Sequence, residues 1–195
     1  MTILLLSGSP SSPSRSTRLL QYAGEKLNVL GQRTVSLHVR DLPAEALMNA
    51  DFSDTELNVA RLLVERADAL VIATPIYKAA YSGLLKAFLD ILPQDGLNGK
   101  LILPLATAGS QSHMLALDYA LRPVLTSLSA RHVLPGVYAT DAQVQWHEQQ
   151  GLQLDAAIAQ RIADGVQLLT ESLHSLRHAH ASKNPAIKEL MCCRA

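Results

Sequence analysis

The sequence predicts an α/β domain in which a parallel sheet is covered by helices on both faces. Short apolar runs alternate with stretches of helical periodicity along most of the 195 residues. Most of these runs are continuously apolar, which is typical of strands buried on both faces. Hydrophobic residues make up 48% of the chain and charged residues 17%, which indicates a folded core rather than a disordered chain.

Five segments are expected to form the strands. Most are apolar throughout, whereas the second has a weaker, alternating pattern. In chain order they are Ile3–Leu6, Thr34–Val39, Ala69–Ala73, Leu101–Thr107 and Val133–Tyr138. Pro104, inside the fourth segment, is unusual for a central strand because proline cannot donate to the ladder.

The segments between and after these strands have apolar residues at helical spacing. The expected helices cover residues 14–31, 54–67, 82–92, 112–130 and 154–175. Pro123 interrupts the fourth of them, since its missing N–H disturbs the i−4 ladder. Little periodicity follows His178, so we expect one domain over residues 1–178 and a tail of unknown role over 179–195.

Two strand orders are common for such a sheet, and five strands favour 2-1-3-4-5, the flavodoxin-like three-layer fold, over 3-2-1-4-5-6. In this order a ligand lies beyond the carboxyl ends of strands 1 and 3, where the order switches. The loops at residues 7–17 and 74–82 are therefore expected to face each other across one crevice.

Composition excludes several classes of function. The 17 basic and 17 acidic side chains balance, which gives no electrostatic basis for binding nucleic acid or an anionic membrane. No apolar segment approaches the roughly 20 residues that span a bilayer. The only cysteines, Cys192 and Cys193, are adjacent and show no metal-ligand spacing. We expect a soluble cytoplasmic protein without a metal site.

The loop from Ser7 to Thr17 has the composition of a phosphate site. It matches neither G-x-G-x-x-G nor a Walker A loop. It combines several serine hydroxyls and one arginine with the N-terminus of a helix, and these groups bind a terminal phosphate dianion. Gly8 allows the tight turn. The expected phosphate ligands are Ser9, Ser14, Arg15 and Ser16. The alternative is that Ser14 or Ser16 only caps the helix.

Two further loops carry a family resemblance. The segment TPIYKAAYSGLLKAFLD, residues 74–90, resembles the T-P-x-Y and S-G-x-L-K-x-x-L-D signature of NAD(P)H-dependent FMN reductases. Residues 107–110, TAGS, resemble the T-G-G-[ST] turn of the same family, with Ala108 in place of the first glycine. The resemblance implies flavin contacts from Pro75, Ile76, Tyr77, Lys78, Thr107, Gly109 and Ser110. Lys86 and Asp90 are expected to form a surface pair four residues apart.

Over residues 3–145 the chain is most similar to the reductase of two-component alkanesulfonate monooxygenase systems. This resemblance implies a homotetramer or dimer with Tyr119 in a π-bulge at the interface, near a neighbour's flavin. It also implies that FMN and NADPH or NADH are the cofactors, and that hydride passes between them without a catalytic side chain. The reduced FMN would go to an FMNH₂-dependent monooxygenase.

Two alternatives share this fold. One is a quinone or azo-type reductase with tightly bound FMN, and the other is a flavodoxin-like electron carrier. The neutral charge and Arg15 argue against the second, because flavodoxins are usually strongly acidic and use a T/S-x-T-G-x-T phosphate loop. The sequence does not distinguish NADPH from NADH as the hydride donor.

Overall fold

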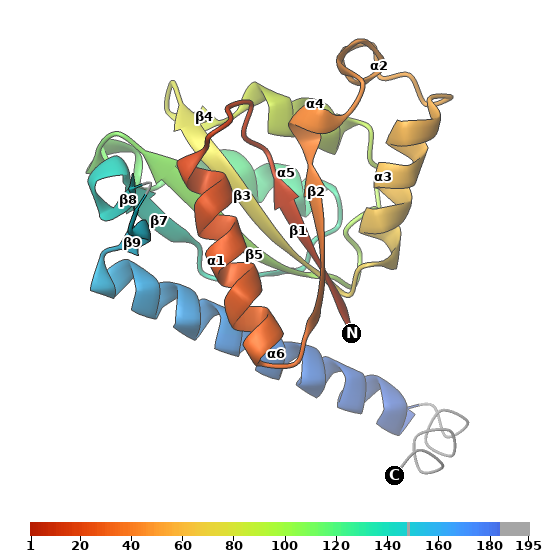
Figure 1. The fold of residues 1–195 in the computed structure, drawn as a ribbon. Coiled ribbons are helices and arrows are strands. Elements are labelled where there is room, and N and C mark those ends of the chain that lie inside the picture. Colours follow the sequence, from red (N-terminus) through yellow and green to blue (C-terminus); the bar gives the residue numbers. More distant parts are fainter. Residues whose placement is uncertain (148, 184–195) are drawn as a thin grey trace.

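The computed structural model describes residues 1–147 and 149–183 and has three layers, a twisted sheet between two sets of helices (Figure 1). The sheet has the order β2-β1-β3-β5-β6, with β7 also beside β5, and all of these pairings are parallel. Its strands are β1 (Thr2–Ser7), β2 (Arg33–His38), β3 (Ala69–Tyr77), β5 (Leu101–Ala108), β6 (His132–Val133) and β7 (Val137–Thr140). The predicted order 2-1-3-4-5 is confirmed.

The last predicted strand is divided into two short strands, β6 and β7, and Pro104 explains the division. β6 pairs with Leu101 and Ile102 of β5, and β7 pairs with residues 105–108. The N–H of Leu134 donates to the Ile102 carbonyl. The backbone groups of alternate residues in a strand point to the same neighbouring strand, so those of Pro104, like those of Ile102, point toward β6 and β7. Pro104 has no N–H there to continue the ladder. A central proline is therefore accommodated at a gap between two edge strands.

The helices divide between the two faces of the sheet (Figure 1). One face is covered by α1 (Arg15–Val29) and α6 (Ala156–Lys183), the other by α3 (Thr55–Arg66), α4 (Gly83–Asp90) and α5 (Arg122–Ser127). Helix α6 continues beyond the expected end at residue 175. Residues 184–195, with Cys192 and Cys193, lie outside the described part of the chain.

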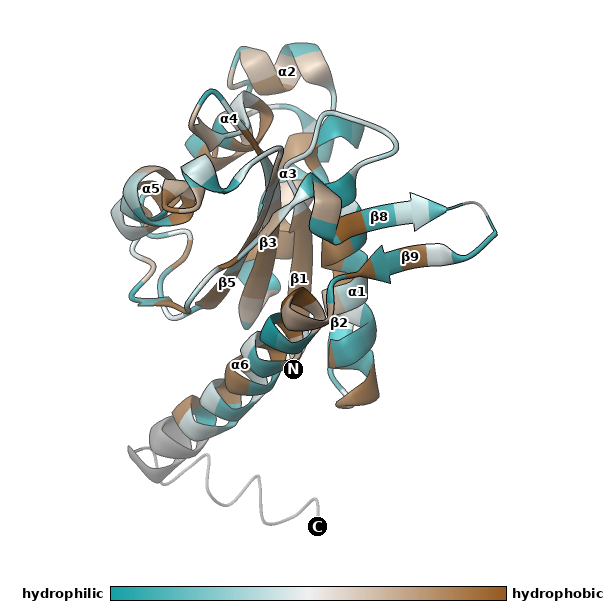
Figure 2. Cartoon of the chain, turned by 90° about the vertical axis from the view of Figure 1, so that its left-hand side faces the viewer, coloured by the Kyte–Doolittle hydropathy of each residue, from teal (hydrophilic) through white to brown (hydrophobic). Residues whose placement is uncertain are grey.

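Alternate residues of each central strand enter different cores. On β1, Leu4 and Leu6 join the core under α3 and α4, whereas Ile3 and Leu5 join the core under α1 and α6. Figure 2 shows these strands as the most hydrophobic part of the ribbon. Burial on both faces is the reason for the continuous apolar runs.

The segment expected as a helix over residues 112–130, interrupted at Pro123, is divided into more elements than predicted. It consists of a 3₁₀ turn (Gln111–His113), a π-helix (Leu117–Leu121) and α5. Pro123 cannot donate to the carbonyl of Tyr119, four residues earlier, so an α-helical ladder cannot pass through this point. The expected π-bulge around Tyr119 is confirmed.

Several short elements were not predicted. They are α2 (Ala44–Met48), β4 (Ala80–Tyr81), the 3₁₀ turns Val39–Asp41 and Asp141–Gln143, and the hairpin of β8 (Val144–His147) and β9 (Gly151–Leu154). The hairpin projects from the body of the domain (Figure 2). Within residues 1–147 and 149–183, no helix has the length and hydropathy to cross a bilayer.

Candidate functional site

The carboxyl ends of β1, β3, β5 and β7 meet at a pocket of about 160 Å³. The two loops expected to face each other lie on either side of it. Its lining is Ser9, Ser11, Pro13, Ser14, Arg15, Pro75, Ile76, Tyr77, Thr107, Ala108, Gly109 and Asp141. Eight of the predicted site residues are therefore brought together, and Ser16, Lys78 and Ser110 lie outside the lining.

The N-terminus of α1 forms one wall of this pocket. Ser14 is its N-cap, because its Oγ accepts from the N–H of Thr17 at 3.2 Å. Ser16 is only 1% exposed, and its Oγ lies 3.0 Å from the Ser14 Oγ. Within the described part of the chain, the N–H groups of Arg15 and Ser16 have no hydrogen-bond acceptor. The capping role of Ser14 thus coexists with free donors that suit an anion.

Arg15 shares the pocket with an acidic residue that was not predicted. Its Nη1 lies 3.5 Å from Oδ2 of Asp141, and the two side chains are 53% and 45% exposed. Asp141 directly follows β7. The sequence signal for Asp141 was its position directly after the last parallel strand, since such positions gather at the ligand edge of the sheet. The predicted strand ended at Tyr138, so Asp141 was not recognised as the residue that follows it.

A buried hydrogen-bond network fixes loop 7–17 against loop 74–82. The Ser82 Oγ donates to the carbonyl of Gly8 and accepts from the N–H of Leu85 at 3.1 Å. The Ser82 N–H donates to the Thr74 Oγ1 at 3.0 Å. Gly8 is needed here for close approach rather than for its turn, because a Cβ on it would lie 2.6 Å from the Cβ of Leu85.

Loop 74–82 is a tight hairpin with an unusual backbone. Lys78 and Ala79 have φ values of 49° and 66°, as in a type I′ turn but without glycine. Such conformations cost free energy and often accompany functional sites. Tyr119, from the π-helix, donates its hydroxyl to the Ala79 carbonyl and so supports the turn from within the same chain. Tyr77, the residue before this turn, is exposed.

The third loop keeps an ordinary backbone at its altered position. Ala108 is the last residue of β5 and its φ is not left-handed, so alanine replaces the family glycine without strain. Gly109 has open space where a Cβ would lie. The carbonyl of Ser110 accepts from the hydroxyl of Tyr138 at 2.5 Å. Burial raises the pKa of Tyr138, and the negative charge of Asp141 raises it further.

These groups fit flavin mononucleotide. Hydroxyls, free N–H groups and a guanidinium at the start of α1 match a phosphate, while Pro75, Tyr77 and Gly109 border the open end. A volume of about 160 Å³ is smaller than the roughly 300–1,000 Å³ of a complete ligand pocket. A pocket of this size can enclose only part of a flavin.

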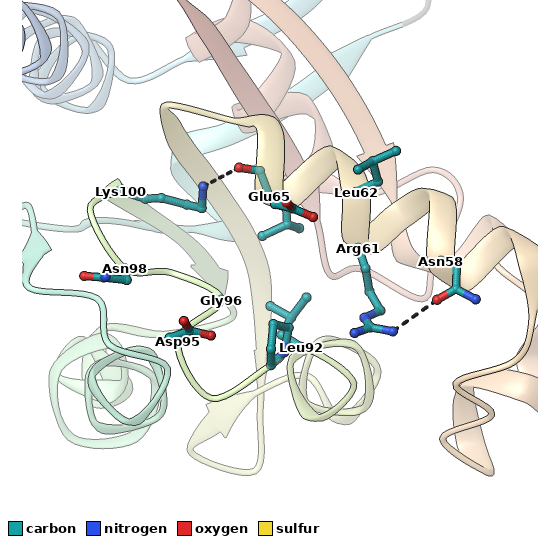
Figure 3. A pocket seen from close by; sticks show the side chains of 11 residues that line it. Asn58, Arg61, Leu62, Glu65, Leu92, Asp95, Gly96, Asn98 and Lys100 are labelled. Carbon is teal, nitrogen blue, oxygen red and sulfur yellow. Dashed lines mark hydrogen bonds between the residues drawn. The ribbon is translucent and has the colours of Figure 1, made fainter.

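A larger cavity of about 670 Å³ lies at the other edge of the sheet, between α3 and the segment before β5 (Figure 3). Its two cationic side chains, Lys100 and Arg61, each make hydrogen bonds within the chain, whereas the buried Nε of Arg61 has no partner among the described residues. The Lys100 Nζ donates to the carbonyls of Glu65 and Ala67, each at 2.8 Å, and burial lowers the Lys100 pKa. Arg61 donates to the Asn58 side chain at 3.1 Å. Lys100 thereby caps the C-terminal end of α3, a structural role.

Lys100→Met should lower the free energy of unfolding by about 1–2 kcal/mol, because it keeps the apolar stem and leaves two carbonyls without their donor. Urea unfolding measures this change. Lys86→Met, which removes the predicted surface pair with Asp90 (Nζ–Oδ1 2.6 Å), should cost no more than about 0.5 kcal/mol. Equal costs for the two variants would contradict the capping role.

Comparisons with known proteins agree with this geometry. A family model described as NADPH-dependent FMN reductase matches residues 1–145. The FMN reductase (NADPH) of Escherichia coli K12 is 49% identical over 144 residues, which cover 74% of this chain and 75% of that protein. The FMN reductase (NADPH) of Pseudomonas putida is 44% identical over 168 residues, covering 86% and 85%.

The same likeness holds among solved structures. The apo form of an NADH:FMN oxidoreductase superposes with a TM-score of 0.80 at 41% identity, covering 88% of this chain and 89% of that one. The similarity therefore extends beyond the sequence motifs to the arrangement of most of the fold.

Proposed function

The chain belongs to the NADPH-dependent FMN reductase family, and we propose that it transfers hydride from NADPH or NADH to FMN and then releases the reduced flavin. The observation that carries the proposal is the pocket at the carboxyl edge of the sheet. There the anion-binding end of α1 lies opposite an open surface formed by residues 75–77. No other pocket described above combines these two features.

The residues of the pocket have separate tasks in this proposal. Ser9, Ser14 and Arg15 hold the phosphate. The Ser16 hydroxyl supports Ser14 through the hydrogen bond between their side chains. Pro75, Ile76 and Tyr77 border the ring, and Lys78 sets the shape of their hairpin. Thr107 and Gly109 form the opposite border, and Ser110 follows them in the same loop. FMN itself supplies the hydride-accepting chemistry when it is bound, so the protein contributes orientation and an open ring face.

The proposed acceptor of the reduced flavin is a separate FMNH₂-dependent monooxygenase of the alkanesulfonate type, in organosulfur assimilation. Two observations support release rather than retention of FMN. The sequence resembles two-component reductases over residues 3–145, and the pocket is small and open with balanced charge. We place this reaction in the cytoplasm, where both the pyridine nucleotide and the partner enzyme would be available.

The experiment is a steady-state assay of NADPH and NADH oxidation with FMN, FAD and riboflavin as varied acceptors. The proposal expects oxidation that depends on added FMN, and purified protein that loses its flavin on dilution. Flavin that stays bound through gel filtration, with turnover only on quinones or azo dyes, would support the alternative of a tightly bound flavoprotein. Absence of any pyridine-nucleotide oxidation would support an electron carrier.

We further propose a homotetramer with the π-helix at its interface. The support is a group of exposed apolar side chains around the site, Tyr77, Met114, Leu115 and Tyr119. Tyr119→Ala should shift the protein to a smaller oligomer, measured by light scattering on a sizing column. Leu168→Ala, an exposed apolar residue of α6, is the control and should leave the mass unchanged. An unchanged mass for Tyr119→Ala would contradict this interface.

A further inference from the structure

Asp141 is the acidic residue among those that line the flavin pocket, and its place is fixed by the backbone. It begins the 3₁₀ turn Asp141–Gln143, which a capping box at Thr140 holds in place. In this box the Thr140 N–H donates to the Gln143 Oε1 at 2.9 Å. The carboxylate is therefore presented to the pocket by a formed element rather than by a loose loop.

The charge of Asp141 acts on Arg15, which lines the pocket, and on Tyr138, which lies outside the lining. Its Oδ2 lies 3.5 Å from the Arg15 Nη1, on the phosphate side. Its negative charge also raises the pKa of Tyr138, whose hydroxyl donates a hydrogen bond to the Ser110 carbonyl in the third loop. Among the lining residues, Arg15 is the positively charged one and Asp141 the negatively charged one, so the lining has no net charge.

This arrangement opposes tight binding of a phosphate dianion. The phosphate must compete with the Asp141 carboxylate for the Arg15 guanidinium. The negative charge of Asp141 also repels the negatively charged phosphate. Because both side chains are about half exposed, the Arg15–Asp141 pair itself is weak and opens readily. Arginine therefore remains able to bind the phosphate, while Asp141 reduces the net gain.

We propose that Asp141 sets the flavin affinity low, as a built-in competitor of the FMN phosphate, and so keeps FMN an exchangeable substrate. This inference rests on the proposed function, in which reduced FMN leaves the enzyme. Asp141 acts by pairing with Arg15 and by repelling the phosphate. It takes no part in hydride transfer.

The test is Asp141→Asn, which keeps the shape of the side chain and removes its charge. Equilibrium fluorescence titration should show FMN bound roughly 5- to 30-fold more tightly, with slower FMN dissociation in stopped flow. Riboflavin, which lacks the phosphate, should bind within about two-fold of wild type. Raising the salt concentration should shrink the FMN difference, because the effect is electrostatic.

The matched control is Asp90→Asn, which removes an acid of a surface ion pair away from the pocket and should change neither affinity. A wild-type enzyme that turns over FMN, with no tighter FMN binding in Asp141→Asn, would overturn this inference and leave the proposed function intact. Equal tightening for FMN and riboflavin would also overturn it. A wild-type protein that binds no FMN would overturn both.

Discussion

Arg15→Ala should weaken FMN binding by about 10- to 100-fold, the usual value of charge-assisted hydrogen bonds to a phosphate. The turnover number at saturating FMN should stay within about three-fold of wild type, because the proposed role of Arg15 is to hold the phosphate, away from the reacting ring. Steady-state kinetics with varied FMN separates these two effects as a change in KM with little change in kcat.

Two variants serve as controls for this result. Arg15→Lys keeps the charge but loses the planar fork, and it should fall between wild type and Arg15→Ala. Arg177→Ala removes an equally exposed arginine, which is paired with Asp68 at 3.0 Å, and it should leave the FMN KM unchanged. A large fall in kcat for Arg15→Ala with unchanged FMN affinity would show that Arg15 is not the phosphate anchor.

Ser82→Ala should lower the free energy of unfolding by about 2–4 kcal/mol, an unusually large cost for loss of one hydroxyl. The substitution removes the N-cap of α4, worth about 1 kcal/mol, and leaves the buried Gly8 carbonyl without its donor, which costs about 1–3 kcal/mol. Because this network joins the two loops of the pocket, FMN affinity should fall as well.

Chemical denaturation measures the stability change, and Ser127→Ala provides the comparison. The Ser127 hydroxyl donates to the Val124 carbonyl at 2.8 Å, but the residue is exposed at the end of α5. Its loss should cost about 0.5 kcal/mol or less. Similar losses at the two serines would mean that the contact between Ser82 and Gly8 does not hold the loops together.

The strand pattern and the ligand edge were predictable from the sequence because they depend on local signals. Burial on both faces imposes continuous apolar runs such as Ile3–Leu6, and parallel strands place their following loops at one edge. The expected surface pair of Lys86 and Asp90 also follows from spacing alone, and is confirmed.

The parts that sequence reasoning missed depend on tertiary contacts. The presence of Pro104 in the central strand β5 is explained only by the gap between its neighbours β6 and β7, which are distant in sequence from Pro104. The contact of Gly8 with Leu85 depends on how α4 packs. The partnership of Arg15 with Asp141 joins residues 126 positions apart along the chain, so no local pattern reports it.

Hydrogen–deuterium exchange with and without saturating FMN locates the flavin site directly. We expect slower exchange of backbone amides in three segments, residues 8–18, 75–82 and 107–112, and unchanged exchange at residues 92–100 beside the larger cavity. Protection confined to α3 and residues 92–100, with the three loops unaffected, would show that the flavin does not bind at the carboxyl edge of the sheet.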